Sequence, residues 1–331
     1  MIKIEQRAST VLYKWLISNC LGYRFLIPAN VCSVVPLTFL KAGIDFDFVD
    51  INFSTHAGSF AEYLYKLSRM PGKKGVLFVN AYGHYNDTGG FFEEIKHISM
   101  NIPVVEDNCL CIPETERTAP KNNVDLELYS TGLSKFVQLS IGGGYGIVKD
   151  DVVYTNHTEK YAEDADKQQH NLIRECRIKR KPFVYNDNHW LKFQRTTLKN
   201  VSDLDYISMV TEKIGKTQSH KQVINQIYED IIPDAIKMGP IFNNWRYQLL
   251  LPTIEMKQAI LTSLEQSNLF ASGHYASAAI VYKNQYCPNT EEEAKVIANL
   301  FNDEKYSETM AIETANIIKD IYNQYDKQRK V

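Results

Sequence analysis

Short apolar segments alternate with helical segments along the first 150 residues, and this alternation limits the possible folds more than any other feature of the sequence. Apolar runs that predict strands lie at residues 24–27, 46–51, 75–79, 103–105, 126–128 and 144–148, and helical patterns lie at 10–18, 34–41, 60–67 and 91–99. Strands that alternate with helices favour a largely parallel sheet with helices on both faces. The sequence therefore predicts an α/β domain.

Polar residues follow three of these predicted strands. Asn80, Asp107 and the stretch from Ser130 to Lys135 each stand where a strand ends. In open α/β sheets, ligands collect at the carboxyl ends of the strands. We therefore expect these three groups to converge at one edge of the sheet.

The stretch from Ser130 to Lys135 contains small and hydroxylated residues and a single lysine, and the glycine patch 142–146 follows it. An amine that burial helps to deprotonate can attack an aldehyde and form a Schiff base. The glycines allow a ligand to approach the backbone closely. One lysine is a weak motif, so the alternative at this point is a solvent-facing side chain in a loop.

Two further groups upstream change the balance. Ser9 and Thr10 stand at the start of a predicted helix, where hydroxyls and free backbone N–H groups form a site for an anion. Asp107 offers a carboxylate about thirty residues before Lys135. A lysine, a carboxylate and a phosphate site are the parts that hold pyridoxal phosphate (PLP), because the carboxylate keeps the pyridine nitrogen protonated and the ring becomes an electron sink.

The composition excludes several other classes. The formal net charge of the 331 residues is −2, which gives no reason to expect nucleic acid or an anionic membrane as a partner. No apolar run has membrane-spanning length, and residues 1–5 lack a signal core, so we expect a cytoplasmic protein. The six cysteines are scattered, which favours reduced thiols and predicts no metal site.

The second half of the chain has a different character. Residues 151–200 are polar and rich in Lys and Arg with interleaved aromatic residues, which fits either a solvated connector or a lid whose Arg177 and Arg180 pair with a substrate phosphate. Further elements expected are a helix at 203–231 interrupted at Gly215, a strand at 245–251, and helices at 254–266, 290–302 and 308–324. This pattern predicts a large domain over 1–202 and a smaller α+β domain over 203–331.

In order and spacing, the chain resembles the DegT/DnrJ/EryC1/StrS family of sugar aminotransferases over nearly its whole length. The matching pieces are Pro28-Ala29, Ala42-Gly43, Phe48-Val49-Asp50, Tyr82-Gly83, Val104-Val105-Glu106-Asp107, Ser130 to Lys135 with the glycine patch, and His274-Tyr275. The resemblance implies a three-layer fold of the aspartate aminotransferase type and a homodimer with active sites at the subunit interface.

The resemblance also implies roles for individual residues. Lys135 would be the Schiff-base lysine and Asp107 the partner of the pyridinium nitrogen. The phosphate would bind at Ser130 and at Ser9 and Thr10. The family's stacking aromatic falls near Cys32, with Asn30 as the other candidate, and His274 and Tyr275 would contact the substrate.

The activity that follows is a PLP-dependent transfer of an amino group, from glutamate as donor, to a keto sugar on a nucleotide carrier, in polysaccharide or amino-sugar biosynthesis. The alternative is a non-catalytic homologue that acts as a binding or assembly subunit. Cys32 and an N-terminus close to Ser9 favour this alternative, whereas the retained Lys135 and Asp107 count against it. Dehydration of the sugar is less favoured, because relatives with that activity replace the lysine.

Overall fold

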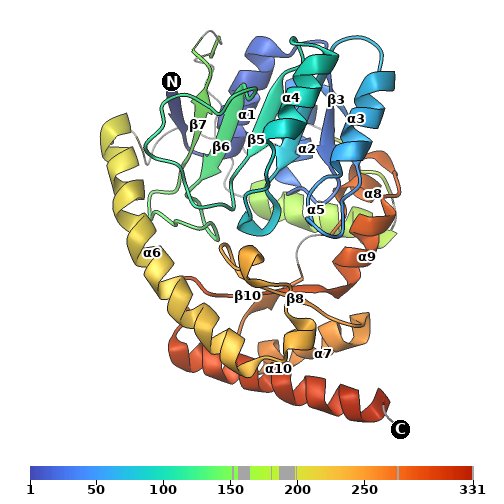
Figure 1. The fold of residues 1–331 in the computed structure, drawn as a ribbon, viewed down its shortest axis with the longest axis vertical. Coiled ribbons are helices and arrows are strands. Elements are labelled where there is room, and N and C mark those ends of the chain that lie inside the picture. Colours follow the sequence, from blue (N-terminus) through green and yellow to red (C-terminus); the bar gives the residue numbers. More distant parts are fainter. Residues whose placement is uncertain are drawn as a thin grey trace.

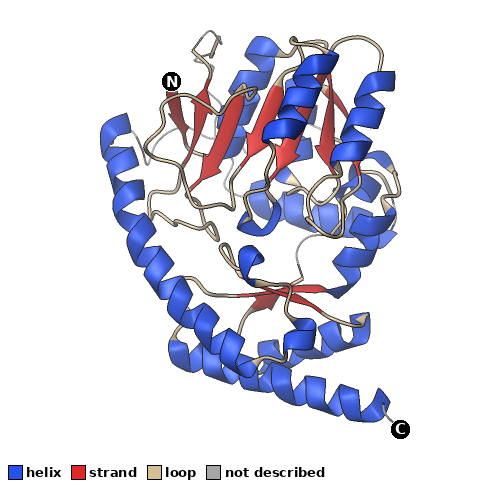
Figure 2. Ribbon diagram, viewed as in Figure 1, coloured by secondary structure: helices blue, strands red, loops and turns tan. Residues whose placement is uncertain are grey.

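The larger of two sheets contains seven strands in the described part of the chain (Figure 1, Figure 2). The computed structural model describes residues 1–150, 153–155, 165–179, 181–185, 198, 200–273 and 276–329. The strands are β1 (Ile2–Glu5), β2 (Arg24–Pro28), β3 (Asp45–Val49), β4 (Lys74–Val79), β5 (Val104–Asp107), β6 (Leu126–Ser130) and β7 (Gly144–Val148). Their order is β1-β7-β6-β5-β4-β2-β3, with the run from β3 to β6 parallel and β7 and β1 antiparallel.

Every strand predicted in the first 150 residues is present, and β1 is an addition that the sequence did not indicate. β1 has only four residues and gains its stability from pairing with β7. The Met1 ammonium strengthens this pairing, because it donates to the Val148 carbonyl oxygen at 2.6 Å.

Helices cover both faces of this sheet. On one face lie α1 (Ala8–Asn19) and α2 (Val34–Ala42), and on the other lie α3 (Phe60–Arg69) and α4 (Gly89–Ile98). Within β2, Phe25 and Ile27 pack towards the α1 side, while Leu26 packs towards the α3 side. This alternation follows from the two-residue period of a strand, and it buries the sheet on both sides. The predicted three-layer α/β fold is confirmed.

The second sheet contains three strands in the order β8-β10-β9, namely β8 (Tyr247–Leu250), β9 (Ala271–Ser272) and β10 (Ile297–Leu300). The helices α7 (Ile254–Gln266) and α10 (Glu308–Arg329) pack against it below the large sheet in Figure 1, and α9 (Pro288–Val296) leads into β10. The predicted helix over 290–302 is therefore wrong beyond Val296. Residues 297–300 are all buried although Asn299 is polar, and a buried run of four residues is too short for its period to distinguish helix from strand.

The seven-stranded sheet with its helices forms the large part of the molecule, and the three-stranded sheet with its helices forms the small part. The long helix α6 (Asp203–Ile231) connects these two parts. The Ser202 hydroxyl caps its start by accepting from the Asp205 N–H at 3.1 Å. Near this end, Tyr206 packs beside Tyr145 of the large sheet, whereas Tyr228 lies in the core of the small part. The predicted interruption at Gly215 is wrong, because the helix continues through it. Figure 1 shows α6 running along one side of the molecule from one part to the other.

The described part of the 151–200 segment packs on the large sheet. Most of it is α5 (Ala165–Lys179) and residues 181–185, and α5 lies beside α8 (Ala278–Lys283). Ile173 and Phe183 are buried in the same cluster as α1 and α2, and the Phe183 N–H donates to the Val281 carbonyl at 2.7 Å. Phe183 is therefore a core residue. The division of the chain at residue 202 stays a prediction.

Three-residue 3-10 helices stand at Ala81–Gly83, Asp234–Ile236 and Pro240–Phe242. Among the described helices, none has both the length and the apolar character that crossing a membrane requires.

Candidate active site

A cavity of about 560 Å³ opens at the carboxyl ends of β5 and β6, between these strands and the start of α1. Its walls come from five separate stretches of the chain. The lining residues are Gln6 to Ser9, Leu12, Cys32 to Val35, Asp107, Cys109, Leu128, Ser130, Gly132, Leu133, Lys135, Gly142 and Gly143. The structure thus brings Ser9, Cys32, Asp107, Ser130 and Lys135 together around one space.

Asp107 is the last residue of β5, and only 7 % of its surface is exposed. Its Oδ1 accepts a hydrogen bond from the Cys109 N–H at 2.9 Å, which fixes the carboxyl group at the strand end. Its neighbour Glu106 points to the opposite face of the sheet, because successive side chains in a strand alternate. There the Lys121 Nζ lies 2.9 Å from Glu106 Oε2, so only one of the two acids reaches the cavity.

Asn80, the third group expected at this edge, belongs to the Glu106 side. Its amide donates to Glu106 Oε1 at 3.0 Å and to Asn108 Oδ1 at 2.6 Å. Asn80 does stand at the expected edge of the sheet, because its N–H donates to the Asp107 carbonyl at 3.1 Å. Its side chain is fully buried and does not join Asp107 and Lys135 at the cavity. The cause is again alternation, which sends its side chain into a structural network.

Lys135 stands on the loop between β6 and β7, and this loop closes on itself. The Thr131 N–H donates to the Gly143 carbonyl at 3.1 Å, and the Leu139 N–H donates to the Thr131 carbonyl at 3.0 Å. Gly143 has a φ of +117°, and a Cβ there would lie 2.4 Å from the Tyr206 hydroxyl. Glycine at 143 therefore lets the loop turn back beneath α6 while Lys135 stays partly exposed at the cavity wall.

The start of α1 forms the opposite wall. Arg7 is its N-cap residue, no side chain caps the helix there, and its first turn contains no acidic residue. A helix N-terminus with a guanidinium beside it and no carboxylate in its first turn favours an anionic ligand. Ser9 lines the cavity, whereas the Thr10 side chain is buried and does not.

Cys32 lies on the loop between β2 and α2, where the family pattern has its stacking aromatic. The described residues that line the cavity include no aromatic side chain. Aliphatic and sulfur-containing groups surround the space instead, among them Leu12, Val35 and Cys109. A planar ring bound here would rest on these groups without an aromatic partner.

Cys109 is a second nucleophile at the cavity, and its environment keeps it protonated. Burial raises the pKa of the Cys109 thiol well above its ordinary value, and the neighbouring Asp107 carboxylate raises it further. The thiolate, and not the thiol, is the reactive form. Lys135 is therefore the better placed nucleophile for a carbonyl group.

These residues fit PLP. An amine, a buried carboxylate on the adjacent strand, two hydroxyls and a helix N-terminus match its aldehyde, pyridine nitrogen and phosphate. The volume is within the range of sites for small cofactors. In the described part of the chain, no group of three or more His, Cys, Asp or Glu side chains could hold a metal ion.

No family model matches the sequence, and no curated protein matches it either. Solved structures do match the fold. A DegT DnrJ EryC1 StrS aminotransferase from Brucella abortus is 13% identical, with 96% of this chain and 85% of that chain covered and a TM-score of 0.63. DesI, solved in the presence of its TDP-sugar product, is 12% identical, with 99% and 83% covered and a TM-score of 0.70. NtdA from Bacillus subtilis, solved with bound cofactor PMP, is 16% identical, with 96% and 73% covered and a TM-score of 0.63.

The chain has the fold of the sugar aminotransferases. At identities of 12 to 16% the likeness concerns the fold, and it confirms the expected aspartate aminotransferase architecture. In this aminotransferase fold, the cavity between α1, β5 and β6 is lined by residues that the sequence analysis predicted to hold the cofactor.

The expected substrate residues are placed less completely. Arg177 is exposed on α5, which packs against α8, and it does not line the cavity. Arg180, His274 and Tyr275 lie outside the described residues.

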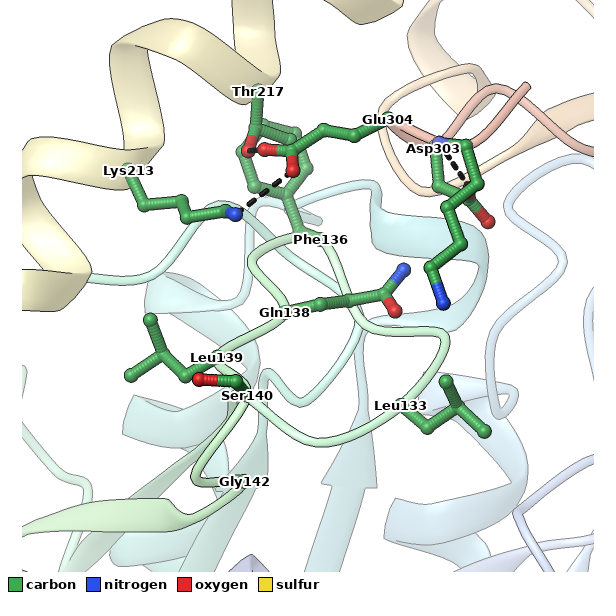
Figure 3. Close-up of a pocket in the computed structure, with 11 residues that line it drawn as sticks. Leu133, Phe136, Gln138, Leu139, Ser140, Gly142, Lys213, Thr217, Asp303 and Glu304 are labelled. Carbon is green, nitrogen blue, oxygen red and sulfur yellow. Dashed lines mark hydrogen bonds and ion pairs between the residues drawn. The ribbon is translucent and has the colours of Figure 1, made fainter.

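A second cavity of about 490 Å³ adjoins the first and shares Leu133 and Gly142 with it (Figure 3). It lies between the Lys135 loop, α6 and residues 303–305. Lys213 and Glu304 form an ion pair at 2.8 Å across it, and Thr217 donates to Glu304 at 3.3 Å. This cavity could not be predicted from the sequence, because its walls are more than 70 residues apart in the chain.

Sequence reasoning also missed Arg7 as a cavity residue. The signal was present, because an arginine directly before a helix start that lacks acidic residues favours an anion there.

Proposed function

We propose that this protein is a PLP-dependent aminotransferase that transfers an amino group from an amino-acid donor to a keto sugar. The observation that carries the proposal is the cavity that gathers Ser9, Asp107, Ser130 and Lys135 from three distant parts of the chain. An amine, a carboxylate and a helix N-terminus around one cavity suit the aldehyde, the pyridine nitrogen and the phosphate of PLP.

Each residue has a defined task in this proposal. Lys135 would hold the cofactor covalently through its Nζ. Ser9, Ser130 and the start of α1 would hold the phosphate, with Arg7 beside them. Asp107 would keep the proton on the pyridine nitrogen. Bound PLP supplies the electron sink that makes a proton at the Cα of the donor acidic. The freed Lys135 Nζ would take that proton and later deliver a proton to the new amine-bearing carbon.

The substrate class follows by analogy. DesI was solved with a TDP-sugar product, and we propose a nucleotide-linked keto sugar for this chain as well, with glutamate as donor. Such a product would serve amino-sugar or polysaccharide biosynthesis. We also propose a homodimer, which light scattering would detect as twice the chain mass of 38.0 kDa.

A second candidate rests on a specific observation. No aromatic side chain is present among the described residues of the cavity wall, and stacking normally contributes to holding a flat cofactor. A protein that binds PLP weakly or without turnover, and acts as a binding or assembly subunit, would fit this feature.

The half-reaction with glutamate separates the two candidates. Glutamate added to the PLP-loaded protein should convert the cofactor to its amine form, with a change in its visible absorbance and release of 2-oxoglutarate. Lys135→Ala should abolish this conversion and leave the fold intact, whereas the exposed control Lys216→Ala on α6 should react like the wild type. A wild-type protein that binds PLP and produces no keto acid with any amino-acid donor would favour the non-catalytic candidate.

A further inference from the structure

Ser134, the residue directly before Lys135, has a left-handed backbone conformation with a φ of +59°. Only a small share of residues other than glycine adopt this region, and such residues persist where the surrounding structure holds them. Contacts of Ser134 should therefore account for its conformation.

Two side chains from the small part provide these contacts. The Trp245 Nε1–H donates to the Ser134 carbonyl oxygen at 2.6 Å, and Arg246 Nη2 donates to the Ser134 hydroxyl at 3.1 Å. Trp245 and Arg246 are buried, with 3 % and 6 % of their surfaces exposed, whereas Ser134 is partly exposed. The Ser134 carbonyl belongs to the peptide group that joins it to Lys135. Because the peptide group is planar, holding this carbonyl fixes the orientation of the backbone that precedes the Lys135 Cα, and with it the direction of the side chain.

Trp245 and Arg246 are themselves held firmly. Arg246 Nη1 donates to the Ser272 hydroxyl of β9 at 2.6 Å, and its guanidinium stacks 3.9 Å from the Phe301 ring. The Trp245 carbonyl accepts from Lys221 of α6 at 2.6 Å. The pair is thus anchored on the small sheet and on α6.

The large part is shaped to receive Trp245. Gly83 has a φ of +79°, and a Cβ at this position would lie 3.0 Å from the Trp245 backbone nitrogen and 2.7 Å from the Leu110 carbonyl. Glycine at position 83 therefore leaves room for Trp245, whereas any side chain at this position would displace the tryptophan.

We propose that Trp245 and Arg246 are positioning residues that hold Ser134 in its left-handed conformation and thereby direct the Lys135 amine into the cavity. The small part of the molecule then controls the reactivity of Lys135 without contacting the cofactor. This inference rests on the proposed role of Lys135 as the residue that binds PLP.

The test compares Trp245→Phe with a matched control, Trp15→Phe. The first change removes the N–H donor and keeps an aromatic ring. Trp15 is buried in α1, its Nε1 has no hydrogen-bond partner among the described residues, and it does not line the cavity. The full chain, freed of bound cofactor, is mixed with PLP, and the rate at which a borohydride-stable adduct forms at Lys135 is measured. Hydrogen–deuterium exchange of the peptide 131–140 provides a readout that needs no cofactor.

Trp245→Phe should slow adduct formation by roughly fivefold to tenfold and speed exchange of the loop peptide, because the hydrogen bond to the Ser134 carbonyl is lost. Trp15→Phe should leave both rates at the wild-type level. Equal rates in Trp245→Phe and the wild type would overturn the inference while the PLP assignment stands. A wild-type protein that forms no adduct at Lys135 would overturn the proposed function and this inference with it.

A double-mutant cycle keeps the test decisive if Trp245→Phe does not fold. Ser134→Ala and Arg246→Met remove the two ends of the same hydrogen bond. Each should slow adduct formation roughly threefold, and the double variant should be no slower than either single variant. Additive losses would show that Arg246 acts only through general stability, which would contradict its positioning role.

Discussion

At the scale of single residues, the candidate site depends on which side chains of two strands face the same way. Asp107 faces the cavity while Glu106 and Asn80 face the opposite layer. The sequence indicated where the strands end, and the two-residue period then separates the acid that can reach a ligand from the acid that supports the sheet. The hydrogen bonds of Ser134 with Trp245 and Arg246 could not be predicted, because these partners lie 111 and 112 residues further along the chain.

Asp107→Asn is expected to impair catalysis far more than it impairs the fold. An asparagine Oδ1 can still accept from the Cys109 N–H, so the turn after β5 should persist. The amide cannot stabilise a positive charge on the pyridine nitrogen, which should lower single-turnover rates by about two to three orders of magnitude. Stopped-flow measurement of the glutamate half-reaction tests this, and an unchanged rate would exclude the role proposed for Asp107.

Cys32→Phe is expected to strengthen PLP binding. The cavity wall lacks an aromatic side chain among the described residues, and a ring at position 32 would supply a stacking partner. Aromatic pairs contribute about 0.5–1.5 kcal/mol, so the dissociation constant should fall roughly twofold to tenfold. A fluorescence titration with PLP measures this. Cys32→Val adds bulk without a ring and should give no gain; an equal gain from valine would assign the effect to packing.

At the scale of elements, strands and helices of the large part were predicted well, because alternation, helix period and glycine stops agree there. The errors occurred where local pattern carries no such information. β1 is too short to show a period, and β10 is a short buried run whose strand form comes from pairing with β8 and β9. Gly215 stops no helix, because the packing of both ends of α6 outweighs the weak propensity of one glycine.

The contact between β7 and the start of α1 should be sensitive to a single methyl group. A Cβ at position 144 would lie 2.2 Å from the Ala8 nitrogen, so Gly144→Ala should push the helix start away from the strand. We expect a loss of stability of about 1–3 kcal/mol and weaker binding of PLP through its phosphate.

Gly215→Ala is the matched control for this change. A Cβ at 215 meets no atom within 4 Å, and alanine favours the interior of α6, so stability should rise by about 0.5–1 kcal/mol. Urea unfolding and PLP titration of both variants provide the comparison. A Gly144→Ala variant that matches the wild type in both measurements would refute the close approach of β7 and α1.

Lys221 on α6 should make the stability of the folded protein depend on pH. Burial lowers the pKa of Lys221 to about 7, well below that of the same group in the unfolded chain. Between about pH 7 and the ordinary lysine pKa near 10.4, the unfolded state therefore binds more protons than the folded state, and stability from this group rises with pH.

The Lys221→Met variant lacks this dependence. Its stability relative to the wild type should fall by about 2 kcal/mol between about pH 6 and about pH 9, as measured by urea unfolding. Lys216→Met, at an exposed position on the same helix, should show no such trend. A Lys221→Met difference that stays constant with pH would show that Lys221 is charged in the folded protein.

At the scale of the whole molecule, the large part provides the cavity and the small part reaches it through α6 and the Trp245–Arg246 pair. The sequence was sufficient to predict the architecture, because many weak motifs in a fixed order restrict the fold more than any one of them. It was not sufficient to predict the contacts between the two parts, since these depend on how the parts pack in space.

The central claim is that Lys135 is the residue to which PLP attaches. The most direct measurement is reduction of the PLP-loaded protein with borohydride, followed by proteolysis and mass spectrometry. We expect a phosphopyridoxyl group fixed as a secondary amine on Lys135, at close to one per chain and absent from Lys135→Ala. An unmodified Lys135 with label scattered over surface lysines would contradict it.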